Sequence, residues 1–201
     1  MSTYSILNNR RNSFPSYSYL IFSLLIAYMS TAQAADLATL KAINSAGGLA
    51  LPHPGKGEQW EVEFHLRGRE LTDEGLKHVA ALKNVVVLNL RDTQITSAGL
   101  MHLKDLRNLR RLHLERTQVD DEGIGNLAGL GDLEYLNLYG TKITDKALNQ
   151  LTGLKNLKQL YVWQTGVTEE GADKLRKALP GVKVVRGIDL SKVVVVKKPE
   201  P

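Results

Sequence analysis

The residue types best suited to contact a partner recur along this sequence at a spacing of 24. They stand between regularly placed leucines, at positions where the side chain changes from one copy to the next. After residue 34 the chain has five Tyr and Trp residues, and four of them fall on these variable positions. Because Tyr, Trp and Arg dominate binding hot spots, we expect a partner-binding surface here. The predicted partner-binding residues are Arg111, His113, Tyr135, Asn137, Tyr139, Tyr161 and Trp163.

Three variable positions in each copy predict three columns of side chains across one face of a sheet. The first column is Glu63, Val87, Arg111, Tyr135 and Gln159; the second is His65, Asn89, His113, Asn137 and Tyr161; the third is Arg67, Arg91, Glu115, Tyr139 and Trp163. Neighbouring strands lie about 4.8 Å apart, so Tyr139 and Trp163 should touch, and Asn137 should lie beside Tyr161. Arg111 next to Tyr135 predicts a cation–π contact.

Catalytic and metal-binding chemistry is not indicated. His65 and His113 share a predicted column, but they are two strands apart, about 9.6 Å, too far for the roughly 2 Å bonds of one ion. Acids recur at Asp73, Asp121 and Asp145, where they suit the starts of helices. The sequence has no phosphate-binding loop and no Ser-His-Asp grouping. We therefore expect a protein that is not an enzyme and that has no cofactor.

Two adjacent copies of one 24-residue unit, residues 109–132 and 133–156, establish the period. Such a period is the signature of a stacked repeat array. Further copies lie at 85–108 and 157–180, and a degenerate first copy lies at 61–84, with Phe64 and Leu66 among its apolar positions. One coil cannot bury its own leucines, whereas stacked coils share a continuous core.

Each unit predicts a strand, a turn and a short helix. Leu133-x-x-Leu136-x-Leu138 gives the period of two that favours a strand. A threonine follows in four copies, and we expect its hydroxyl to bond turn groups that neighbouring coils leave unpaired. The next polar position holds residue types typical of a helix N-cap. A small residue three positions later should let the helix start approach the preceding coil. The predicted N-cap residues are Thr72, Thr96, Asp120, Thr144 and Thr168.

The unit L-x-x-L-x-L-x-x-T-x-[IV]-T-D-x-[GA]-L-x-x-L-x-x-L resembles leucine-rich repeats, and is most similar to the secreted bacterial kind abundant in planctomycetes. It resembles more distantly the repeats of F-box substrate adaptors and of internalins. The resemblance covers residues 61–186. It implies an α/β solenoid, a curved right-handed coil with a parallel sheet on the concave face and short helices on the convex face. It also implies that the usual role is binding other proteins. The position of the turn threonine holds Thr instead of Asn, which is commoner there in the family, and the sequence has neither an F-box-like segment nor a cell-wall anchoring motif.

The segments outside the array predict export and capping. Arg10 and Arg11, an apolar stretch of about ten residues and Ala32-Gln33-Ala34 indicate a signal peptide, residues 1–34, cleaved after Ala34, since a membrane span needs about 20 residues. Residues 35–60 predict a capping helix over 36–46 followed by a loop from Leu51 to Gly57. Residues 181–186 predict a capping strand, and residues 187–201 a tail with a valine run.

The predicted signal peptide indicates a secreted or periplasmic binding module, and the composition of the chain excludes several kinds of partner. Loss of Arg10 and Arg11 leaves 24 basic against 21 acidic residues, a net charge of +3 that is too small to imply nucleic acid. The chain has no cysteine. We expect a protein or peptide partner, and no stable membrane span once the signal is removed. The alternatives are a structural envelope component that self-assembles, with the valine-rich tail as its candidate contact, and a substrate-recognition adaptor similar to F-box leucine-rich-repeat proteins.

Overall fold

The computed structural model describes residues 34–54 and 58–187. The chain divides after Ala34, and the coils belong to the unit that starts at Ala35. The predicted signal peptide and the valine run of the tail lie outside the described residues. Among the helices that are described, none is both long and apolar enough to cross a membrane.

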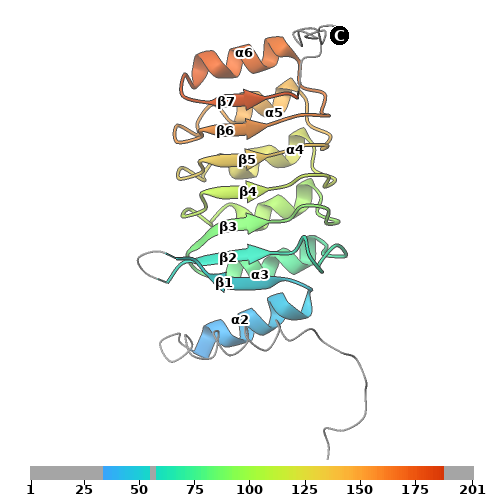
Figure 1. Ribbon diagram of the computed structural model, residues 1–201, viewed down its shortest axis with the longest axis vertical. Helices are drawn as coiled ribbons and strands as arrows, with labels where there is room; N and C mark the ends of the chain where they lie inside the picture. Colours follow the sequence, from blue (N-terminus) through green and yellow to red (C-terminus); the bar gives the residue numbers. More distant parts are fainter. Residues whose placement is uncertain (1–33, 55–57, 188–201) are drawn as a thin grey trace, which may run out of the picture. The chain divides into compact units, whose positions relative to one another are not determined.

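A seven-stranded sheet runs through this unit in the order of the sequence, β1 to β7 (Figure 1). The first two strands pair antiparallel, and every later neighbouring pair is parallel. The strands are β1 (Leu49–Pro52), β2 (Trp60–Glu63), β3 (Val85–Asn89), β4 (Arg111–His113), β5 (Tyr135–Asn137), β6 (Gln159–Tyr161) and β7 (Lys183–Val185). The predicted α/β leucine-rich-repeat solenoid is confirmed, with its C-terminal strand.

Helical turns cover one side of the sheet. They are η1 (Asp73–Gly75), α3 (Leu76–Ala81), η2 (Ser97–Leu103), α4 (Asp121–Ile124), η3 (Gly125–Leu127), α5 (Asp145–Gln150) and α6 (Glu169–Ala178). In Figure 1, α3, α4 and α5 lie behind the strands, and α6 lies beyond β7. The capping helix α2 (Ala34–Ser45) comes before β1. It buries Leu40 and Ile43, as its helical spacing predicts, and leaves Leu37 partly exposed.

The core lies between the sheet and the helices. The central residue of each three-residue strand is buried, as Leu112, Leu136 and Leu160 show, each with no exposed surface. Its two neighbours point to the other side of the sheet, because successive side chains of a strand alternate. Full burial of one leucine is worth about 1.5–3 kcal/mol, so the continuous leucine rows are the main source of stability.

The threonine that follows the strand is buried in three coils and half-buried in a fourth, and its hydroxyl bonds within its own coil. Thr93, Thr117 and Thr141 are at most 5% exposed. Each donates to the carbonyl oxygen three residues earlier, at 2.6–2.8 Å, and Thr165 does the same. The prediction that these hydroxyls bond turn backbone groups left unpaired by neighbouring coils is confirmed, but the bonds do not join one coil to the next. The reason is local: the turn after each strand brings the preceding carbonyl back over the hydroxyl.

Neighbouring coils are joined instead by a second polar row, which we call the polar ladder. It consists of one carboxylate and one hydroxyl at each junction: Asp73–Thr96, Ser97–Asp120, Asp121–Thr144 and Asp145–Thr168. At the Asp121 junction, Thr144 donates its backbone N–H at 2.7 Å and its hydroxyl at 2.6 Å to the carboxylate. The predicted N-caps at Thr96, Asp120, Thr144 and Thr168 are confirmed by side-chain bonds to backbone N–H groups.

The polar ladder explains the small residue that follows each cap. A Cβ added at Gly99 would lie 2.2 Å from the carboxylate oxygen of Asp73, and one added at Gly171 would lie 2.1 Å from that of Asp145. The side chain of the preceding coil thus occupies the space that a larger residue needs. The prediction of a close approach at this position is confirmed.

The first coil differs from the prediction in register. Glu61 pairs with Val87 and Glu63 with Asn89, after an irregularity between Trp60 and Glu61. Seven residues lead from Phe64 to Leu71, whereas five lead from Leu90 to Ile95 in the next coil. This longer turn absorbs two residues that a strict 24-residue period assigns to the strand.

Three predictions for the N-terminal region are therefore wrong. Leu66, expected in the core, lies in the longer turn and is 64% exposed, while Val62 is fully buried in the strand. His65 is not in the column of His113, because Glu63 occupies that register. Leu51 and Pro52 were expected in a loop, but they end β1, which pairs with β2 because alternating burial lets Ala50 face the core.

Candidate binding face

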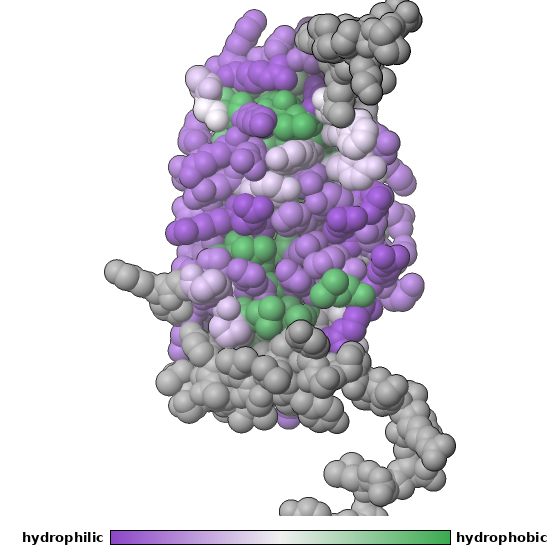
Figure 2. All heavy atoms as spheres, viewed as in Figure 1, coloured by the Kyte–Doolittle hydropathy of each residue, from purple (hydrophilic) through white to green (hydrophobic). Residues whose placement is uncertain are grey.

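The side of the sheet opposite the helices, which we call the sheet face, carries the predicted partner-binding residues. The register places Arg111, Tyr135, Gln159 and Lys183 in one column and His113, Asn137, Tyr161 and Val185 in the next. Both columns of these coils agree with the prediction. In the first coil Glu61 and Glu63 replace the expected Glu63 and His65. Figure 2 views this face, and weakly hydrophilic side chains, drawn pale, gather over β5 and β6.

Tyr139 and Trp163 form a stacked pair at the edge where the strands end. Their ring centroids lie 5.3 Å apart with an interplanar angle of 28°, so the predicted contact is confirmed. The guanidinium of Arg116 lies 5.7 Å from the centroid of the Tyr139 ring. On the other side, a Cβ at Gly187 would lie 2.3 Å from the Trp163 ring. Trp163 is 49% exposed although its ring is held between two neighbours.

A second aromatic group surrounds Tyr135. The Arg111 guanidinium lies 4.3 Å from the Tyr135 ring centroid, which confirms the predicted cation–π contact. The rings of His113 and Tyr161 lie 4.8 Å and 5.4 Å from the same ring. Burial raises the pKa of the Tyr135 phenol, so the group stays neutral well into the alkaline range. Asn137 lies beside Tyr161, as predicted.

Hydrogen bonds beneath these rings converge on Glu115. Its Oε1 accepts from His113 Nδ1 at 2.9 Å and from Asn137 Nδ2 at 2.7 Å. Asn137 also donates to the hydroxyl of Tyr135 at 3.2 Å and accepts from the backbone N–H of Tyr139 at 3.1 Å. One carboxylate thus fixes the side chains that position both aromatic groups, since ordered polar networks hold their members in place.

Glu115 is the residue whose role sequence reasoning missed. The columns predict a side chain on the open face, but Glu115 is only 6% exposed, and its second oxygen, Oε2, has no hydrogen-bond partner among the described residues. A lone acid among tyrosines and asparagine is the only signal in the sequence. The polar side chains at the same height on neighbouring strands, which bury it, become visible only in the folded chain.

The turns after the strands add an ion pair to one edge of the sheet face. Arg116 Nε donates to Asp92 Oδ1 at 2.6 Å, and this bond holds the pKa of the Asp92 carboxyl below its ordinary value. Asp92, Arg116 and Gln164 all have a positive φ, at the position where Gly140 stands in its coil. A non-glycine residue costs about 1–2 kcal/mol in this conformation. These three non-glycine residues therefore hold a strained backbone conformation at this edge.

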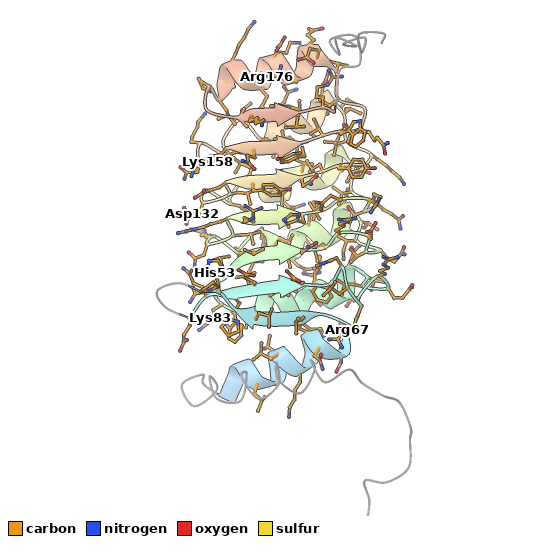
Figure 3. The ribbon with its side chains drawn as sticks, in the orientation of Figure 1. His53, Arg67, Lys83, Asp132, Lys158 and Arg176 are labelled. Atoms are coloured by element: carbon orange, nitrogen blue, oxygen red, sulfur yellow. The ribbon has the colours of Figure 1, made fainter. Side chains whose placement is uncertain are left out.

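The edge where the strands start is polar. In Figure 3, Asp132 and Lys158 lie along this edge, while Arg67 lies at the opposite edge. Lys158 Nζ donates to Glu134 at 2.6 Å and lowers the pKa of that carboxyl. A pocket of about 250 Å³ is lined by the turns that lead into β3 and β4, away from the aromatic groups. Within residues 34–54 and 58–187, no three His, Asp or Glu side chains are placed to hold a metal ion.

Comparison with known proteins identifies the repeat. A family model described as Leucine Rich repeat matches residues 81–104 and 105–128, two consecutive windows of the 24-residue period. No curated protein matched the sequence.

Several solved structures are similar to part of this chain. An internalin C2 from Listeria monocytogenes is 29% identical over 54% of this chain and 44% of its own, with a TM-score of 0.47. An internalin F from the same organism is 22% identical over 57% of this chain and 32% of its own, with a TM-score of 0.47. The ectodomain of the receptor kinase SOBIR1 from Arabidopsis thaliana is 16% identical over 77% of this chain and 92% of its own, with a TM-score of 0.49. The chain spans less than half the length of either internalin.

Proposed function

We propose that this leucine-rich-repeat protein is an exported, non-catalytic interaction module that binds a protein or peptide through its sheet face. The anchors are the residues named from the sequence, Arg111, His113, Tyr135, Asn137, Tyr139, Tyr161 and Trp163. The observation that carries the proposal is the stacked pair of Tyr139 and Trp163, which leaves about half of a tryptophan open to solvent.

An exposed aromatic side chain that is already held in place suits binding. Association costs conformational freedom for every side chain that becomes fixed, and a preorganised ring has less to lose. Tyr139 and Trp163 are fixed by each other and by Arg116. The hydrogen bonds of Asn137 fix the hydroxyl of Tyr135 and the backbone at Tyr139. The residue types are those of hot spots, and their setting favours the same role.

The size of the face favours a narrow partner segment. Five strand spacings of about 4.8 Å separate β2 from β7, which gives a face roughly 24 Å long. With only a few side-chain positions on each strand, this surface is smaller than the about 800 Å² per partner of a standard interface. A peptide or a single protruding segment of a protein uses such a surface better than a flat globular face does.

The experiment is capture of a partner from extract by the immobilised chain without its first 34 residues. We expect the double variant Tyr139→Ala, Trp163→Ala to lose most of the captured protein, since each hot-spot aromatic contributes about 2 kcal/mol or more. The matched control is Leu37→Ala, Met101→Ala, which removes two exposed apolar side chains that belong to helices α2 and η2. Circular dichroism shows whether both variants stay folded.

The proposed binding site is wrong if the folded aromatic variant captures the same protein in the same amount as the unmodified chain. Export is tested separately. We expect the protein recovered from the producing cells to begin at Ala35 and to lie outside the cytoplasm, which cell fractionation and mass measurement of the N-terminal peptide establish.

A further inference from the structure

The exposed charge of the sheet face changes sign along the sheet. β2 contributes two acids, Glu61 and Glu63, whereas Arg111 on β4 and Lys183 on β7 are exposed cations. Neither cation has an ion pair with a described residue, while Arg91 and Arg116 both pair with Asp92. From β4 to β7 the acid on this face is Glu115, and it is buried and hydrogen-bonded. Glu134 lies close enough to Arg111 for their charges to interact, but its carboxylate is paired with Lys158. The surface around the aromatic groups therefore offers two exposed cations that have no ion pair with a described residue.

The guanidinium of Arg111 is positioned to bind a carboxylate. Its guanidinium stacks over Tyr135 at 4.3 Å, and its side chain makes no hydrogen bond to a described residue. Stacking occupies a face of the guanidinium plane and leaves its N–H edge free, and that edge matches a carboxylate with two parallel hydrogen bonds. The ring beneath holds the group in position, so little further freedom is lost when an acid binds.

The two cations and the stacked aromatic pair have the spacing of an extended chain. Arg111 and Lys183 share a column and lie three strand spacings apart, about 14 Å. Four residues of an extended chain cover about 13 Å, and alternate side chains point to opposite sides. A chain laid along the sheet with one side toward this column therefore turns its second and fourth side chains toward the strand ends, at the heights of Tyr139 and Trp163.

We propose that the partner is an acidic peptide segment bound in extended form across β4 to β7, with two carboxylates four residues apart at Arg111 and Lys183. Its apolar side chains in the second and fourth places contact Tyr139 and Trp163. This inference rests on the proposed function and specifies the partner. Glu61 and Glu63 keep the segment away from β2, because an acidic segment that extends over this strand meets like charge. The chain's own tail is a poor occupant, since residues 191–201 carry three lysines and one glutamate.

The test measures fluorescence anisotropy of three labelled peptides with the chain from Ala35 onward. The first has Glu-Leu-Gly-Leu-Glu between flexible ends, the second has Gln in place of both Glu, and the third has Lys there. We expect the acidic peptide to bind about tenfold more tightly than the Gln peptide, with the Lys peptide weakest, and the advantage to shrink as salt rises.

Two charge variants test whether the tighter binding of the acidic peptide depends on Arg111 and Lys183. Arg111→Gln, Lys183→Gln removes the proposed contacts and should reduce the advantage of the acidic peptide to less than about twofold. Lys146→Gln, Lys177→Gln removes the same net charge from exposed lysines of α5 and α6 on the other side of the sheet, and should leave the advantage in place. Both variants keep every residue of the core.

The outcomes separate this inference from the function beneath it. Equal binding of the three peptides, binding of none, or equal loss in both charge variants overturns the acidic partner. If capture from extract still depends on Tyr139 and Trp163, the proposed function stands and only the chemistry of the partner is wrong. If capture does not depend on them, the proposed function itself fails.

Discussion

The polar ladder and the sheet face use the same 24-residue period in opposite ways. At each ladder junction one carboxylate meets one hydroxyl, and only the assignment of the two groups to the coils changes. On the sheet face, the column that holds Arg111 holds Tyr135, Gln159 and Lys183 in the next three coils. Repeated chemistry therefore joins coils, while varied chemistry is available for recognition.

The two regions also differ in how they satisfy their polar groups. Ladder groups are bonded to the neighbouring coil, and a coil without its neighbour leaves them unpaired. On the sheet face, the exposed cations Arg111 and Lys183 have no ion pair with a described residue, and about half of the Trp163 surface is open to solvent. We therefore expect ladder substitutions to change the free energy of unfolding and sheet-face substitutions to change binding.

The largest expected effect on stability is that of Asp121→Ala. The Asp121 carboxylate accepts from the backbone N–H and hydroxyl of Thr144 and from the backbone N–H of Ala147. Its loss should lower the free energy of unfolding by about 2 kcal/mol, measured by urea denaturation, because bonds to a charged group are lost and donors are left unpaired. The control Glu122→Ala, at the exposed neighbouring position, should cost less than about 0.5 kcal/mol. A similar cost for both variants contradicts the role of the polar ladder, and so does a loss of peptide binding in folded Asp121→Ala.

A smaller effect follows from exchanging the two groups of the Ser97–Asp120 junction. This junction is reversed, because its carboxylate belongs to the later coil, whereas the earlier coil supplies the carboxylate at the other three junctions. Ser97→Asp sets two carboxylates against each other, and Asp120→Thr leaves two hydroxyls, so each should destabilise the fold by about 1 kcal/mol. The double variant restores one carboxylate and one hydroxyl, in the arrangement of the other three junctions. We expect a favourable coupling of about 1–2 kcal/mol from a double-mutant cycle of urea denaturation. Additive costs disprove the pairing.

The smallest expected effect is a change in acid sensitivity. Hydrogen bonds from Thr168 hold the pKa of Asp145 below its ordinary value, and a bond from Ser97 does the same for Asp120. A lowered pKa in the folded state gives stability that is fully present above the ordinary Asp pKa, about 4, and lost as pH falls through the folded value. Asp120→Asn, Asp145→Asn should flatten the loss of stability below about pH 4 in urea denaturation. Asp132→Asn, at an exposed position, should leave the slope unchanged, and an equal change in both variants refutes the assignment.

Sequence periodicity predicts the parts of this molecule that depend on a residue and its copies. The buried leucines, the caps and the contact of Tyr139 with Trp163 follow from the period and the strand spacing alone. Leu66 was misplaced because a turn two residues longer in one coil breaks the period without changing the residue types. Sequence periodicity does not predict the burial of Glu115 or the partners in the polar ladder. Both depend on contacts between different coils, and the spacing of residues within one copy gives no information about such contacts.

The reversed ladder junction limits how the array can lengthen by duplication of a single coil. A second copy of residues 85–108 in tandem sets Ser97 against Thr96, two hydroxyls, and a second copy of residues 109–132 sets Asp121 against Asp120, two carboxylates. Of these three inner coils, only residues 133–156 bring Asp145 to Thr144, a matched junction like those already present. Residues 61–84 would set Asp73 against Thr72, but they form the end coil with the longer turn. Lengthening by one coil is therefore easiest at the segment that carries Tyr135 and Tyr139, so growth of the scaffold and enlargement of its aromatic surface come from the same event.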